Sequence, residues 1–473
     1  MFADSGPSLV AADPGPLARW GQSVPWQRRI RAATVAGMAL VAIAWMSYQT
    51  YRYFLVGDPN NPGRTAVGAI DISNRFIETR SWFRQEAVYQ SYGQAVYPPA
   101  TYTMLALVFN GLPWPIAKLL WFLGSLVSVG FLSRQLIRLS LVQTSWEKWF
   151  VAILPWATYA TGAALGNGQF VLFVLPLVLN AVLILAENQR STRANWLGIL
   201  LMVAALVQPT IAAPFFWLIL FRIRGYQPAL WVAALYLALT AVAVPFQVNA
   251  QRIVPPDTYG GRPDQQASGA PRPRLKLALP RQGAATNPNG SPILRWLRKG
   301  TNATYVGSID GGYANVHSLL ATPKLAEWNQ LASLAILGIL GLWIFLHRRG
   351  DLWLLLGVTA IVARVWIYHR WYDDLLLILP LITLCRVTKQ PQYSPGLKTV
   401  ATALFLWIWM FLLAPGVLYT FAKPQLPIAL QVTGWLMTLG FLALLAARER
   451  QTPASPADQH PDPSRPPGSP LPA

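Results

Sequence analysis

The sequence predicts an all-α polytopic membrane protein. Of its 473 residues, 54% are hydrophobic and only 12% are charged, and the mean hydropathy is +0.36. Soluble domains carry about 25% charged residues, so the shortage of charge and the repeated apolar runs indicate several membrane-spanning helices. Cys385 is the single cysteine, which excludes an intrachain disulfide and a zinc site built on several cysteines.

The net charge of +20 allows two interpretations. A strongly basic chain can bind nucleic acid. In a polytopic chain, however, Lys and Arg gather in cytoplasmic loops and meet anionic lipid headgroups. We therefore expect membrane lipids, and no nucleic acid, among the partners.

Apolar runs between residues 28 and 450 predict a transmembrane domain of about 11–13 spans. The runs are 30–52, 114–136, 148–165, 168–187, 195–207, 209–223, 228–247, 328–347, 351–367, 371–386, 397–416 and 428–447. Another run, 99–112, is short for a span, and we expect 99–136 to cross once. Residues 1–27 and 451–473 are polar and Pro-rich, which predicts a disordered cytoplasmic N-terminus and a disordered tail.

Basic residues in the short loops predict the orientation. A basic group at Arg28 precedes the first run, and others such as the pair at Arg348 mark further cytoplasmic loops. The two long loops, 53–98 and 248–327, then face outward; loops beyond about 60 residues translocate largely regardless of their charge. No carboxylate lies in the middle of a predicted span, although proton-coupled transporters usually need one there. We expect a multi-pass protein of the plasma (inner) membrane with its site on the outer face.

Asp71 begins a segment of the first outer loop that predicts an amphipathic helix at the membrane interface. Its apolar positions include Ile72, Phe76 and Trp82, and Arg75 is among its polar positions. Two roles for Asp71 are open. It can cap the helix, or its carboxylate can act as a general base at the membrane surface.

Three further outer motifs contain candidate sugar or acceptor ligands. Tyr97-Pro98-Pro99 stiffens the start of an apolar run, which is equally typical of a simple helix start. Asn167 and Gln169 flank the opening of a later span, where amides could bind sugar hydroxyls. Gln208 precedes Pro209 at a break that allows one broken helix or two short ones, and it could instead satisfy the kinked backbone.

The outer turn 369–374 concentrates ionisable side chains. His369 and Arg370 open it, Asp373 and Asp374 close it, and Arg364 lies less than two helical turns earlier. Arg binds phosphate in a bidentate manner and His can donate to it. The alternative is an interfacial basic and aromatic belt with a local Arg–Asp pair.

The second outer loop adds two candidates shortly before the next span. His317 is a candidate phosphate ligand, and Asn315 is a candidate sugar or acceptor ligand, as is Asp373 in the outer turn. The chain lacks a Walker-type phosphate loop, a Gly-x-Gly-x-x-Gly motif and an Asp-x-Asp pair. An outward-facing enzyme would also lack cytosolic nucleotide donors. We expect no cofactor, and the sequence neither predicts nor excludes a divalent metal.

With these motifs, the chain resembles the GT-C glycosyltransferases, and specifically the family 87 enzymes that use polyprenyl-phosphate mannose. The resemblance covers roughly residues 30–450 and rests on Asp71, Tyr89, Tyr97-Pro98-Pro99, Gly168-Gln169, Gln208-Pro209-Thr210 and a late outer loop with Asn315 and Ser318. It implies a GT-C-type helical bundle and inverting transfer of a hexose, mannose by analogy, from a polyprenyl-phosphate sugar to a lipid or glycan acceptor.

The resemblance also implies roles for single residues. Asp71 would be the general base, and His369, Arg370, Arg364 and His317 would serve the leaving phosphate. Relatives commonly carry Lys where this chain has Gln208, so another residue would have to replace it here. Two other readings remain: a transporter or lipid flippase, and a non-catalytic scaffold of the same fold. The position of Asp71 distinguishes the enzyme from the non-catalytic scaffold, because a scaffold needs Asp71 only as a helix cap.

Overall fold

The computed structural model describes residues 24–54, 68–92, 95–187, 191–223, 225–253, 291–293, 295–296, 328–367, 369–416 and 425–451. Regular structure in these residues is helical, with two isolated β-bridges. This confirms an all-α polytopic membrane protein. His317 and Asn315, most of the loop 248–327 and nearly all of both terminal segments lie outside the described residues.

The helices follow one another in this order. They are α2 (Val24–Phe54), α3 (Ile70–Phe83), α4 (Val88–Ser91), α5 (Pro99–Phe109), α6 (Trp114–Leu139), α7 (Ser145–Ile153), α8 (Tyr159–Asn167), α9 (Val171–Glu187), α10 (Thr192–Ala205), α11 (Pro209–Phe221), α12 (Gln227–Ala243), α13 (Pro245–Val248), α16 (Asn329–His347), α17 (Leu352–Val365), the 3-10 helix η5 (Trp371–Leu377), α18 (Ile378–Lys389), α19 (Pro395–Leu412) and α20 (Gln425–Gln451).

Fewer of these helices are long enough to span than the 11–13 predicted. Within the described ranges, five meet the length and hydropathy of a span, namely α2, α6, α16, α19 and α20. A sixth is possible if α8 and α9, which bend by 116° at their junction, count as one. The other apolar runs do form helices, but most are short because Pro or Gly interrupts them. The run 148–165, for example, splits around Pro155 into α7 and α8.

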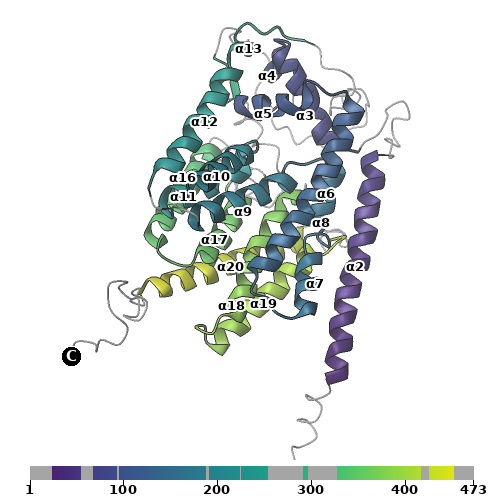
Figure 1. The fold of residues 1–473 in the computed structure, drawn as a ribbon, viewed down its shortest axis with the longest axis vertical. Helices are drawn as coiled ribbons and strands as arrows, with labels where there is room; N and C mark the ends of the chain where they lie inside the picture. The colour runs from purple at the N-terminus through teal and green to yellow at the C-terminus, as the bar shows by residue number, and fades with distance from the viewer. Residues whose placement is uncertain are drawn as a thin grey trace, which may run out of the picture.

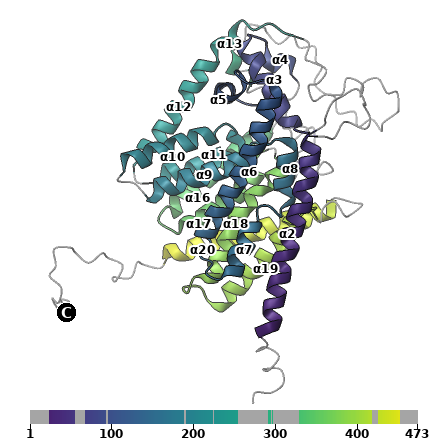
Figure 2. The ribbon, with the colours of Figure 1, turned by 45° about the vertical axis from the view of Figure 1, so that its right-hand side comes forward.

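The long helices differ in how much of their surface other helices cover. Helix α2 stands along the outside of the bundle, and α20 crosses its lower part (Figures 1 and 2). Only 11% of the apolar window of α2 is buried, compared with 39% for α20. Exposed apolar surface of this extent suits contact with lipid tails. Helix α17, by contrast, is buried along nearly its whole length.

Short helices gather at one end of the bundle, where α3, α4, α5 and α13 lie together in both views (Figures 1 and 2). An aromatic cluster joins them: Trp82 stacks on Tyr102 at 4.4 Å between ring centroids and meets Tyr89 edge-on at 5.3 Å. Helix α3 therefore has a different setting from the expected interfacial one. Its polar residues Asn74, Arg75, Glu78 and Thr79 are buried among other helices.

Candidate functional site

The first turn of α3 packs against the junction between α8 and α9. Ala69 precedes α3 with a φ of 62°, and its N–H donates to the carbonyl of Gly166 at 2.9 Å. Gly168 ends α8 with a φ of +74°, and a Cβ added there would lie 2.5 Å from Cγ2 of Ile72. Only glycine suits this backbone and this spacing. The close approach brings Gln169 to the start of α3.

The side chain of Asp71 accepts a hydrogen bond across this contact and does not cap its own helix. Its Oδ2 accepts a hydrogen bond from Nε2 of Gln169, a side chain that is 3% exposed. The cap position of α3 belongs to Ala69, and no side chain caps it. Within the described residues, nothing donates to Oδ1 of Asp71. The carboxylate is therefore oriented by one neighbour and keeps one oxygen for another partner.

The charges around Asp71 are mixed. Burial raises the pKa of its carboxyl group, while the positive charges of Arg370 and Arg75 and the hydrogen bond from Gln169 lower it. The negative charge of Asp373 raises it again. The net shift is upward. A carboxylate with a raised pKa is a stronger base than an ordinary aspartate, and it is still ionised if that pKa stays below neutral pH.

Arg75 is a component of this site that the sequence interpretation did not assign. It lies four residues after Asp71, on the same face of α3. The side chain is buried, ion-paired with Glu78 at 2.6 Å, and stacked 4.6 Å above the centroid of the Tyr97 ring. The i, i+4 spacing from Asp71 was the available signal.

Tyr97 lies beside the same carboxylates. Burial raises the pKa of its phenol, Arg75 lowers it, and the negative charges of Asp71 and Asp373 raise it. Its carbonyl accepts a hydrogen bond of 2.7 Å from the hydroxyl of Tyr89. The two prolines that follow start α5 at Pro99, as the sequence predicts.

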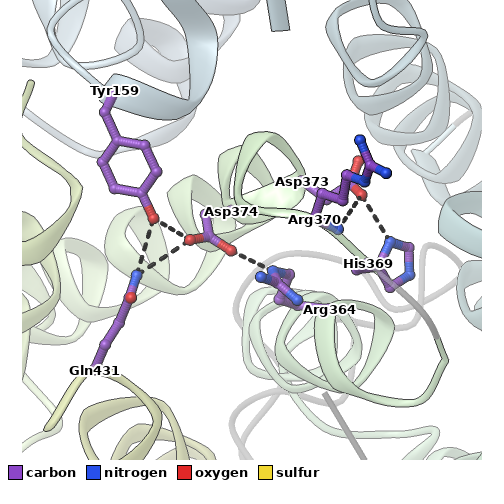
Figure 3. A network of polar contacts seen from close by, with 7 residues as sticks. All are labelled: Tyr159, Arg364, His369, Arg370, Asp373, Asp374 and Gln431. Carbon is purple, nitrogen blue, oxygen red and sulfur yellow. Dashed lines mark hydrogen bonds and ion pairs between the residues drawn. The ribbon is translucent and has the colours of Figure 1, made fainter. Parts of the chain in front are cut away.

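Residues 369–374 lead into the 3-10 helix η5 and supply the other side of the site (Figure 3). Oδ2 of Asp373 accepts from the N–H of Arg370 at 3.2 Å and from Nδ1 of His369 at 3.0 Å. Both His369 and Asp373 are buried, with 1% and 3% exposure. Oδ1 of Asp373 is buried without a hydrogen-bond partner. Such an oxygen suits a hydroxyl donor from a bound molecule.

Asp374, the next residue, points to a different set of partners (Figure 3). It is ion-paired with Arg364 and accepts hydrogen bonds from the hydroxyl of Tyr159 and, at 3.1 Å, from Nε2 of Gln431. The guanidinium of Arg364 also lies 5.1 Å from the ring of Trp435. This buried network joins α8, α17, η5 and α20.

The network corrects the role expected for Arg364. Its side chain is 1% exposed and its charge is neutralised by Asp374. A buried, paired guanidinium is poorly placed to receive a phosphate, since a new partner would have to displace the carboxylate. The alternative that the sequence left open, a local Arg–Asp pair, describes Arg364 and Asp374.

The two remaining candidates among the described residues are Asn167 and Gln208. Asn167 is the last residue of α8, partly exposed, next to the Gly168 turn. Gln208 precedes α11 at the break, which separates two short helices. Its side chain does not satisfy the broken backbone; Thr101 donates to the carbonyl of Val207 at 2.9 Å instead.

Asp71, Gln169, Tyr97, Arg370, Asp373 and His369 thus form one cluster, with Arg75 added by the structure. No group of three or more His, Cys, Asp or Glu side chains suited to a metal ion occurs in the part of the chain that the structure describes. No protein-family model, no curated protein and no solved structure matches this chain.

Proposed function

We propose that this protein is a membrane-embedded glycosyltransferase of the GT-C type. It would move a hexose, mannose by analogy, from a polyprenyl-phosphate sugar to a lipid or glycan acceptor at the outer face of the plasma membrane. The single observation that supports this best is the setting of Asp71. Its carboxylate is held by Gln169 from another helix, with one oxygen open and cationic side chains beside it.

The orientation of Asp71 suits a general base. A base must reach the proton it removes, so its free oxygen has to point at the acceptor hydroxyl. The hydrogen bond from Gln169 fixes one oxygen and leaves the other for that proton. A residue that only capped α3 would face its own backbone N–H groups. This argues against the reading of the chain as a non-catalytic scaffold.

The cationic side chains suit the leaving group. Arg370 and Arg75 act electrostatically on Asp71, so both lie close to it, and His369 is held by Asp373 nearby. A polyprenyl phosphate departs with negative charge, which guanidinium groups stabilise. Arg75 is buried and ion-paired with Glu78, as Arg364 is with Asp374, so the half-buried Arg370 is the candidate for the leaving phosphate.

The reaction would be a single displacement. The acceptor oxygen forms a bond to the anomeric carbon while the bond from that carbon to the phosphate oxygen breaks. The acceptor proton passes to Oδ1 of Asp71, and the electron pair of the broken bond leaves with the polyprenyl phosphate. Attack from the face opposite the leaving group inverts the anomeric centre.

The test is sugar transfer by the full chain in proteoliposomes. Radiolabelled polyprenyl-phosphate mannose and glucose serve as donors, and a native lipid extract supplies acceptors. Removing a general base typically costs on the order of 10²–10⁴ in rate, and we expect that loss in Asp71→Asn. Glu86→Gln, the same change at a half-buried carboxylate of the same outer segment, should retain activity.

Two outcomes would contradict the proposal. Equal transfer by wild type and a folded Asp71→Asn variant would remove Asp71 from the chemistry. Absence of transfer from either donor, in preparations that melt cooperatively, would favour the transporter and scaffold readings.

A further inference from the structure

Two buried amide side chains outside the Asp71 cluster lack hydrogen-bond partners. Both Oδ1 and Nδ2 of Asn329 are buried and unpaired, and the residue is 1% exposed. Oε1 of Gln208 is likewise buried and unpaired, in a residue that is 6% exposed. Leaving a buried amide without partners is unfavourable. Such a group calls for an explanation, and a bound molecule that completes its hydrogen bonds is one.

These two amides lie at the same end of two adjacent helices. Gly341 of α16 packs against the ring of Trp217 of α11, and four residues later Phe345 meets Phe221 at 5.4 Å. The contacts advance in the same direction along both helices, so α11 and α16 run parallel. Gln208 immediately precedes α11, and Asn329 is the first residue of α16.

Trp366 ties these two helix starts together. Its Nε1 donates to the carbonyl of Thr210 at 2.8 Å, and its own carbonyl accepts from the hydroxyl of Ser333 at 2.8 Å. Thr210 lies two residues after Gln208, and Ser333 lies one helical turn after Asn329. The helix starts that carry the two amides are therefore joined through one tryptophan.

The amides also adjoin the Asp71 cluster along the chain. Trp366 is three residues before His369. Thr101, which donates to the carbonyl of Val207, is in the first turn of α5, four residues after Tyr97. The helix starts that carry the two amides thus bond to segments that also contribute Tyr97 and His369 to the cluster.

The chemistry of the unpaired atoms indicates what they bind. Asn329 offers a donor group and an acceptor group, both unpaired. A ligand must therefore supply both an acceptor and a donor, even if the oxygen and nitrogen of the amide exchange places. The buried oxygen of Gln208 needs a donor, which a phosphate diester does not have. Hydroxyl groups both donate and accept. We propose that Gln208 and Asn329 form a subsite for the hydroxyls of an uncharged saccharide, separate from the cationic groups around Asp71.

This inference rests on the proposed function, because it takes saccharides as substrates, but its test measures binding and not transfer. Two sources share the chemistry: the hexose of the donor and the saccharide of the acceptor. The probes are polyprenyl-phosphate mannose, octyl α-mannoside as an acceptor mimic, and polyprenyl phosphate without sugar. The full chain is held in lipid nanodiscs, free of maltoside detergent.

The decisive variant is Asn329→Leu, which keeps the side-chain size and removes both polar atoms. We expect its dissociation constant for a sugar-bearing probe to rise on the order of tenfold, because two modest hydrogen bonds are lost. Affinity for polyprenyl phosphate should stay within about twofold. Loss confined to polyprenyl-phosphate mannose would assign the donor hexose, and loss confined to octyl α-mannoside would assign the acceptor.

Stability provides a second readout. If the amide serves a ligand, the unliganded Asn329→Leu protein should melt at or above the wild-type temperature, since it no longer buries unpaired polar atoms. Thr438→Ala on α20 is the matched control, because it removes a buried hydroxyl that donates to the carbonyl of Gly434 at 2.8 Å and lies outside the proposed subsite. It should lower the melting temperature and leave sugar binding unchanged.

The proposal is overturned by unchanged binding of both sugar-bearing probes to Asn329→Leu, or by an equal loss for polyprenyl phosphate. A lower melting temperature of the unliganded variant would also overturn it, because the amide would then be structural. If Asp71→Asn did not affect transfer, the proposed function would be contradicted, but the binding results for Asn329→Leu would still stand. The two proposals can therefore be refuted independently.

Discussion

Gly168 is the residue whose substitution tests most directly how the site is assembled. It combines a φ of +74° with close approach to α3, and the next residue is the partner of Asp71. In Gly168→Ala, the new Cβ would meet Cγ2 of Ile72 at 2.5 Å and its Cβ at 2.8 Å. Neither atom can move easily, since Ile72 is fully buried.

The expected cost has two parts. A Cβ in the left-handed region costs about 1–2 kcal/mol. Overpacking of a tight contact typically costs about 1–3 kcal/mol more, so Gly168→Ala should lose about 2–5 kcal/mol of unfolding free energy. Gly225 is a matched control, because its φ is +87° but nothing lies within 4 Å of an added Cβ. Gly225→Ala should therefore lose only the first part.

A double-mutant cycle with Ile72→Ala isolates the clash. Removing Cγ2, the nearer of the two atoms that Gly168→Ala strikes, should recover about 1 kcal/mol or more relative to additivity, while the contact with Cβ of residue 72 stays. Equilibrium unfolding in mixed micelles provides the free energies, and sugar transfer provides the functional readout. Transfer should fall with Gly168→Ala, since separating α8–α9 from α3 moves Gln169 away from Asp71.

The reasoning is refuted if Gly168→Ala costs no more than Gly225→Ala. It is equally refuted if the cycle shows no coupling between Gly168 and Ile72, because the contact would then not constrain the junction.

Four further predictions concern charged groups. Because the folded-state pKa of Asp71 is raised, ionisation of its carboxyl group opposes folding as pH rises through that pKa. The melting temperature of Asp71→Asn should therefore exceed that of wild type at pH 8. The difference should vanish below about pH 4, where the carboxyl group is protonated in both states. The acidic limb of wild-type transfer should lie above the ordinary aspartate pKa of about 4, and a limb at or below it would contradict the raised value. Arg370→Met should raise KM for the polyprenyl-phosphate donor roughly tenfold or more, and an unchanged KM would remove Arg370 from phosphate binding. Arg364→Met should lower the free energy of unfolding by about 3–5 kcal/mol, because it leaves the charge of Asp374 buried without an ion-pair partner. The double variant Arg364→Met/Asp374→Leu should recover most of that free energy. No recovery in unfolding experiments would show that the pair is not isolated.

Local signals in the sequence predicted several elements well. The helix that contains Asp71 starts at Ile70, Pro99 opens α5, and Pro209 separates two helices. Each depends on the chemistry of a few neighbouring residues, such as the missing N–H of proline. The apolar content was equally clear, so the fold class followed from it.

Contacts between distant segments were not accessible in this way. Spacing grouped Arg364 with His369 and Arg370, but consecutive carboxylates on η5 face different neighbours, and Arg364 joins the one at Asp374. The burial of Arg75 likewise depends on helices far along the chain. Fewer described helices reach the length of a span than the sequence predicted, because hydropathy does not record where a run breaks, as at Pro155 within the run 148–165.

The site draws its residues from widely separated parts of the chain. Gln169 is 98 residues from Asp71, Tyr159 is 215 residues from Asp374, and Gln431 is 272 residues from Tyr159. During synthesis, Asp71 is therefore made long before the residues that surround it. The network around Asp374 closes only when α20 has been made, so a chain interrupted before its last helix would carry every candidate catalytic side chain in an unfinished setting.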